Sequence, residues 1–196
     1  MSDDILELTP VQMDALREIG NVGAGNSATA LSQIINHRID MNVPQVSIVP
    51  LGDVPDLVGG PDVMVVGVFL RVYGAAPGNI LFLLPAESAF YLVDMLMGKK
   101  HGETKNLDFM DESALMEIGN ILAGAYLNAL FNLTKLSLLP SIPALAVDMA
   151  GAILSVVLIQ LGQMGDHALV IETEFTTDQE GIKGHFFLVP DPGSLD

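Results

Sequence analysis

The 196-residue chain is half hydrophobic and only 16% charged, which is typical of a well-packed globular protein and argues against a disordered one. Its 24 acidic and 8 basic residues give a net charge of −16, which disfavours nucleic acid and anionic membranes and favours a partner with basic groups; an acidic surface that only aids solubility is the alternative. The absence of cysteine excludes disulfide scaffolds, thiolate catalysis and Cys-based metal sites, and it indicates a cytoplasmic protein.

The first predicted element is a long helix over about residues 10–36. Thr9 can cap it, a proline follows at the first helical position, and Gln12 completes a capping box. Apolar or small residues recur at helical spacing and predict the inward face: Leu16, Ile19, Gly23, Ala30 and Ile34. Within about 60° of arc on the opposite side lie Asp14, Glu18, Asn21 and Gly25.

The same helix contains GNVGAGNS, residues 20–27, whose glycine spacing resembles a P-loop and a dinucleotide-binding loop. Both of those loops follow a strand, whereas this segment continues a helix, and Asn26 replaces the P-loop lysine. Nucleotide binding is therefore a minor alternative. Three glycines in six helical residues predict close approach of another backbone.

After this helix, the first half is predicted to contain a strand beginning near Pro44, strands at Val63–Tyr73 and Asn79–Leu84, and a helix at Ala86–Met97. Gly98 is the expected C-cap of that helix. The segment 98–106 carries three of the eight basic residues and is interpreted as a surface linker.

The second half repeats the first. LREIGNVGAGNSATAL, residues 16–31, recurs 99 residues later as LMEIGNILAGAYLNAL, residues 115–130, in a predicted helix over 109–135 that begins with Asp108 and Asp111. The second copy keeps Glu-Ile-Gly-Asn but loses both phosphate-loop spacings. We interpret the halves, about 8–100 and 107–190, as duplicates in one domain of 1–196. The predicted fold class is α/β of the α+β type: two pseudo-symmetric halves share a largely antiparallel sheet flanked by long helices.

The outward face of the first helix is also repeated, as Ser113, Glu117, Asn120 and Gly124. Neighbouring exposed positions diverge between the copies; for example, Arg17 becomes Met116. A single polar helix face is most simply a solvated surface. Its repetition instead favours a functional role, because asparagine is a poor helix former with no packing reason to be kept.

The segment 148–162 is predicted to be a helix, capped by Asp148 and apolar almost all round, so that a buried core helix is the simplest interpretation. The longest uncharged apolar run, Met149–Gly165, falls short of the roughly 20 residues that a membrane-spanning helix needs. Strands at Ala168–Phe175 and His185–Val189 follow. The four histidines are scattered, so no metal site is expected.

The pattern Asp/Ser-x3-Glu-x2-Asn-x22-Pro occurs twice, from Asp14 to Pro44 and from Ser113 to Pro143. It resembles the signature of the CheC/CheX/FliY family of chemotaxis phosphatases, and two intact sites in one short chain look most like the CheC branch. The resemblance implies hydrolysis of the phospho-aspartate of the response regulator CheY. It also implies that the enzyme needs no cofactor of its own, because the substrate brings Mg²⁺ and a lysine.

By the same resemblance, Glu18 and Glu117 would pair with the substrate lysine, and Asn21 and Asn120 would hold the attacking water. Asp14 and Ser113 begin each motif, and their difference leaves open whether the two sites are equally active. CheC proteins also bind the receptor deamidase CheD through a helix in the region of 148–162, which makes Asp148, Ala152 and Ile153 candidate contacts. An adaptor that mainly binds CheD, with weak phosphatase activity, is therefore the alternative function.

Overall fold

The computed structural model describes residues 9–35, 38–43, 45–161, 167–176 and 181–191. The first half contains α1 (Pro10–Ile35), β1 (Asp40–Asn42), β2 (Val46–Pro50), a 3-10 turn (Leu51–Asp53), α2 (Val54–Leu57), β3 (Met64–Gly74), β4 (Gly78–Pro85) and α3 (Ala86–Leu96). The second half contains α4 (Phe109–Thr134), β5 (Leu138–Pro140), β6 (Ala144–Met149), α5 (Ala150–Leu161), β7 (His167–Thr176) and β8 (Gly181–Pro190).

The strands form one eight-stranded sheet in which both halves take part. At its centre β4 of the first half pairs with β8 of the second, and β3 and β7 flank them. The short strands cross over: β1 and β2 pair with β7, whereas β5 and β6 pair with β3. All these pairings are antiparallel, so the predicted fold class is confirmed: each half completes the other half's side of the sheet.

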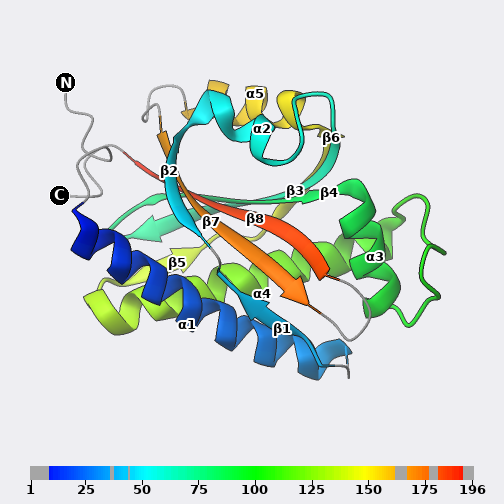
Figure 1. Cartoon of the computed structure of the whole chain (residues 1–196), viewed down its shortest axis with the longest axis horizontal. Coiled ribbons are helices and arrows are strands. Elements are labelled where there is room, and N and C mark those ends of the chain that lie inside the picture. Colours follow the sequence, from blue (N-terminus) through cyan, green and yellow to red (C-terminus); the bar gives the residue numbers. More distant parts are fainter. Residues whose placement is uncertain (1–8, 36–37, 44, 162–166, 177–180, 192–196) are drawn as a thin grey trace.

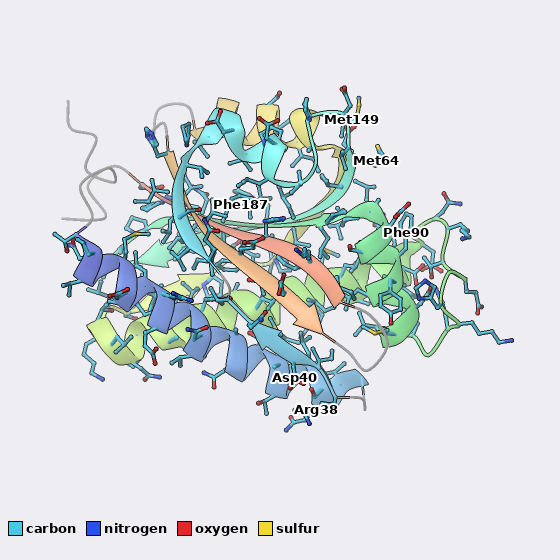
Figure 2. The ribbon with its side chains drawn as sticks, viewed as in Figure 1. Arg38, Asp40, Met64, Phe90, Met149 and Phe187 are labelled. Atoms are coloured by element: carbon cyan, nitrogen blue, oxygen red, sulfur yellow. The ribbon has the colours of Figure 1, made fainter. Side chains whose placement is uncertain are left out.

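Helices cover both faces of this sheet (Figure 1). The long helices α1 and α4 run side by side in opposite directions on one face, and α2 and α5 lie on the other. Strand alternation supplies a core to each layer: Phe82 and Phe186 belong to the cluster under α1 and α4, and their neighbours Leu83 and Phe187 belong to the cluster under α2 and α5. Figure 2 labels Phe187 within the second cluster.

The predicted long helices and central strands are confirmed to within a few residues. The inward face of α1 and α4 is also confirmed except at its last members, because Ile34 and Leu133 are 54% and 58% exposed. These two residues occupy equivalent positions in the repeat. The long helices therefore extend beyond the sheet by the same amount in both halves.

The capping role expected of Asp148 is wrong. Asp148 lies in β6, opposite Val65 of β3, and its carboxylate accepts a hydrogen bond from the adjacent backbone N–H of Met149 at 2.8 Å. The helix begins two residues later, at Ala150. It is also not buried all round, because Ile153 and Leu154 are in the core whereas Val156 is 56% exposed.

The linker between the halves is fixed at both ends. Gly98 has φ +64°, as a C-terminal glycine requires, and the Lys99 N–H donates to the Asp94 carbonyl at 2.8 Å. The buried Asp94 carboxylate accepts from the backbone N–H groups of Gly102 and Thr104. Lys99 then pairs with Asp111 in the first turn of α4, Nζ to Oδ1 at 2.7 Å. The linker thus attaches α3 to the start of α4.

Candidate active site

The predicted site residues of the first half lie on the outer face of α1. Asp14, Glu18 and Asn21 are all exposed, and the helix begins with the expected capping box, in which Gln12 Oε1 accepts from the Thr9 backbone N–H at 2.8 Å. Glu18 and Asn21 are three residues apart and therefore project from the same side of the helix. The structure thus brings together the carboxylate and the amide that the sequence paired.

The second set lies on α4 and differs in its first member. Glu117 is exposed and Asn120 is half-buried. The Ser113 hydroxyl donates to the Phe109 carbonyl of its own helix at 2.8 Å, so it is directed to the backbone rather than to solvent. Asp108 and Asp111 form the predicted capping box at the start of this helix.

The four Glu and Asn side chains are not engaged within the protein. Among the residues that the structure describes, no hydrogen bond or ion pair involves the side chain of Glu18, Asn21, Glu117 or Asn120. A carboxylate that accepts, and an amide that both donates and accepts, therefore remain available to a docked partner in each half.

Glycines seat both helices on the sheet. A Cβ at Gly119 would lie 2.5 Å from Val68 Cγ1 in β3, and one at Gly20 would lie 3.3 Å from Val43 Cγ1 and 3.4 Å from Ile171 Cγ2 in β7. The approach expected of another backbone is therefore wrong: the close neighbours are side chains. The shared Glu-Ile-Gly-Asn sequence thus combines a glycine that faces the sheet with a polar pair that faces outward.

At the contact between the helices, small residues of one copy face a large residue of the other. A Cβ at Gly23 would lie 2.8 Å from the Tyr126 ring, and Ser27 beside it is fully buried. In the repeat, Leu122 and Tyr126 stand where α1 has Gly23 and Ser27. The sequence therefore held a signal for the contact between α1 and α4: two small residues in one copy correspond to two large residues in the other. This signal was missed because the copies were compared only for identical residues.

Tyr126 also connects α4 to the sheet. Its ring stacks on Phe186 with a centroid separation of 4.4 Å, and its hydroxyl lies 3.3 Å from Thr173 Oγ1. Burial raises the pKa of Tyr126 to about 12, and the hydrogen bond with Thr173 opposes that rise. The residue is therefore a neutral packing element beneath the site.

The second glycine that the two copies share, Gly25 or Gly124, has no packing explanation. A Cβ built at Gly25 or at Gly124 would have no atom within 4 Å apart from its chain neighbours and the backbone of its own helix. Both residues lie on the outer face, one turn beyond Asn21 and Asn120. The space over these glycines is open, as expected for a surface that leaves room for a docking protein.

The other predicted positions lie apart from this face. Asp148 is exposed in β6 and Ala152 is half-buried in α5, but Ile153 is only 7% exposed and packs in the second core. Ile153 therefore does not suit the direct partner contact expected of it. Pro143 is half-buried just before β6, and its counterpart Pro44 lies outside the described residues.

Two further properties concern metals and membranes. Among the described residues, no group of three or more His, Asp or Glu side chains could hold a metal ion. The helix α4 is long and apolar enough to span a membrane by length and composition, with 44% of the relevant window buried. It packs against α1 and the sheet, as the core helix of a globular protein does.

This architecture is shared with proteins of chemotaxis and the flagellar switch. FliY of Thermotoga maritima superimposes with a TM-score of 0.75 at 22% identity, covering 92% of this chain and 91% of FliY. CheX of Borrelia burgdorferi, in a complex with CheY, BeF3 and Mg²⁺, superimposes with a TM-score of 0.53 at 15% identity, covering 86% and 96%. At these identities the likeness establishes the fold alone.

Sequence comparison is more specific. The CheC-like family model matches residues 11–48 and 110–146, two segments that begin 99 residues apart and include both polar faces. The CheY-P phosphatase CheC of Bacillus subtilis (strain 168) is 43% identical over 189 residues, covering 94% of this chain and 90% of that protein. The chain belongs to the CheC-like family.

Proposed function

We propose that this protein is a phosphatase that hydrolyses the phospho-aspartate of the response regulator CheY and so terminates or adapts the chemotaxis signal. The observation that carries the proposal is the pair of Glu–Asn sets, each at i,i+3 on the outer face of one of two adjacent helices, with no partner among the described residues. Its support in sequence is the 43% identity with the B. subtilis CheY-P phosphatase CheC.

The chemistry proposed for each site is positioning. An acyl phosphate is reactive without a strong nucleophile, so the main requirement is a water molecule held in line with the phosphorus. The amide of Asn21 or Asn120 can accept from that water and donate to a phosphoryl oxygen, without itself titrating. The carboxylate of Glu18 or Glu117 would pair with a lysine of CheY and so fix the register of the two proteins.

The same proposal assigns Mg²⁺ to the substrate rather than to this chain. The second site offers one carboxylate and one amide, and the first adds only the Asp14 carboxylate, which is too few ligands for a dedicated Mg²⁺ site. The B. burgdorferi complex of CheX with CheY, BeF3 and Mg²⁺ supports a metal that belongs to the docked pair. We further propose that the halves arose by duplication and act as one cytoplasmic domain, since their strands pair across the sheet.

Replacing Glu18 and Glu117 together by glutamine tests both the function and the roles. We expect wild-type protein to accelerate the decay of acyl phosphate on purified CheY, and the double variant to lose roughly 100-fold of that acceleration, because a misplaced substrate loses about that factor. Each single variant should retain the activity of the other site. Glu112→Gln, on α4 but outside the motif, is the matched control. If wild-type protein does not accelerate the decay, the proposed phosphatase function is wrong. If wild-type protein accelerates it and the double variant does so equally well, the phosphatase function stands but the roles proposed for Glu18 and Glu117 are wrong.

A second candidate function is binding of CheD, which the exposed apolar side chains around α5 favour. Met149 and Val156 are 44% and 56% exposed, and Met149 lies opposite Met64, itself 47% exposed (Figure 2). Asp148 is exposed on the same strand end, so it remains a candidate contact, and Ala152 keeps a partly exposed place on α5. Adaptor and phosphatase roles are compatible, because this surface and the Glu–Asn faces lie on opposite layers of the sheet.

For this second function, Met149→Glu with Val156→Glu should weaken binding of purified CheD more than tenfold in calorimetry, since it places charge where apolar surface would be buried. Val11→Glu, which alters a still more exposed apolar residue on α1, should have no effect. Equal affinity of all three proteins for CheD, or no binding by wild type, would rule out this surface.

A further inference from the structure

The two ends of the α1–α4 pair are not equivalent. At one end α3 packs against the first turns of α4 and the last turns of α1, and also contacts β3, β4 and β8 (Figure 1). Leu115 and Ile118 of α4 are almost fully buried, at 1% and 2% exposed, in the same core cluster as Leu92 of α3. The helix therefore closes the core between the long helices and the sheet at this end.

At the other end, the position equivalent to that of α3 is an open apolar groove with a cavity volume of about 370 Å³. Its walls include the start of α1, the end of α4, β7, β8 and the start of β4, which are the pseudo-symmetric counterparts of the five elements that hold α3. Val72 of β3 and Leu138 of β5 also line it. Leu16 and Ile19 line it and stand at the repeat positions of Leu115 and Ile118. Leu130, Leu169 and Leu188 are among the other apolar residues that line it.

We propose that this groove is a docking site for an amphipathic helix of a partner protein, about three turns long and basic on its polar side. The repeat indicates a helix, because the matching elements at the other end of the molecule hold one. Charge indicates a basic partner: Asp14 and Glu18 are exposed on α1 beside the groove, and the whole chain carries −16. The same charge disfavours a second copy of this chain as the occupant.

The proposal does not rest on the phosphatase function, but the groove adjoins only one of the two Glu–Asn sets. Ala15 lines it and is the i,i+3 neighbour of Glu18 on α1, whereas in the other half the covalently linked α3 packs against α4, which carries Glu117. A docked helix would bury Leu16, which is only half-buried in this structure. A partner helix bound in the groove would therefore lie next to the first Glu–Asn set and not next to the second.

A fluorescent peptide derived from α3 tests the site. The probe carries the sequence of residues 86–96 with Glu87→Lys and Asp94→Lys, and the control peptide carries Leu92→Asp in addition. We expect saturable binding of the probe in fluorescence anisotropy, at least tenfold weaker binding of the control peptide, and weaker binding of the probe as salt is raised. Binding that saturates for neither peptide, or equally for both, overturns the proposal.

Variants of the protein locate the binding. Ala15 is exposed on the groove wall, so Ala15→Trp should fill the groove and weaken probe binding at least tenfold, whereas Arg17→Trp, on the same helix but outside the groove, should bind as wild type does. Circular dichroism must show both variants folded; if Ala15→Trp fails to fold, Thr134→Trp on the opposite wall takes its place. Binding that appears only after residues 1–8 are removed, or a dimer in sedimentation that Ala15→Trp dissociates, would assign the groove to another occupant and refute the proposal.

Discussion

Replacing Asn21 and Asn120 together by alanine is expected to abolish the acceleration of CheY-P hydrolysis while leaving the affinity for CheY nearly unchanged. The amide is proposed to hold the attacking water, an interaction that matters only as the phosphoryl group reacts, whereas docking would depend on Glu18 and Glu117. Loss of one well-placed hydrogen-bonding group in such a step costs on the order of 100-fold to 1000-fold in rate. Single-turnover decay of phosphorylated CheY measures the rate, and anisotropy of labelled CheY measures the affinity.

The chain supplies a matched control for this experiment. Asn26 and Asn132 are exposed on the same two helices but are turned about 140° and about 120° away from Asn21 and Asn120, so the double change Asn26→Ala and Asn132→Ala removes two surface amides without touching the proposed sites. It should leave both rate and affinity unchanged. Full activity of the Asn21 and Asn120 variant, or an equal loss in the control, would contradict the water-holding role.

The two single variants apportion the activity between the sites. Asn21 is exposed and its motif begins with an exposed carboxylate, Asp14. Asn120 is half-buried and its motif begins with Ser113, whose hydroxyl is bound to its own helix. The first site can therefore offer one more charged group to a docked protein. The structure thus locates the difference between the sites at this first position, where the sequence had already placed it.

The helices were predictable because local signals agreed with each other. Capping residues, apolar spacing and the repeat all indicated the same two helices, and the central strands are rich in β-branched residues. The three-residue strands β1 and β5 could not be found in this way, because each exists only through pairing with a strand of the other half. Asp148 was misplaced for the same reason: its sequence suits an N-cap, but pairing of β6 with β3 continues through Met149.

Glycine was the residue that sequence reasoning interpreted least well. The spacing in GNVGAGNS indicated that something unusual was close to the helix, but not whether each glycine faced a backbone, a side chain or solvent. The structure separates them: Gly20 and Gly23 face side chains, and Gly25 faces open space. The two repeated glycines of the motif therefore have different explanations: one avoids a clash with side chains of the sheet, and the other leaves the outer surface open. An added methyl group should destabilise the protein at the first position and not at the second.

Gly119→Ala is expected to lower the free energy of unfolding by about 1–3 kcal/mol, the usual cost of overpacking a core. Its methyl group would lie 2.5 Å from Val68 Cγ1, and a β-branched side chain on a paired strand has little freedom to move away. Gly25→Ala with Gly124→Ala should do the opposite, by about 0.5–1 kcal/mol for each residue, because alanine is the better helix former and both positions face open space. Urea unfolding at neutral pH measures both changes.

Activity then decides why Gly25 and Gly124 recur. If these glycines leave room for CheY, the more stable Gly25→Ala and Gly124→Ala protein should dephosphorylate CheY-P more slowly, with the loss in affinity rather than in single-turnover rate. In that case the two glycines lower the stability of the helices, and they keep the surface open for docking. Unchanged affinity in a protein that is measurably more stable would mean that the outer glycines do not serve docking, and that the partner approaches the Glu–Asn faces from another direction.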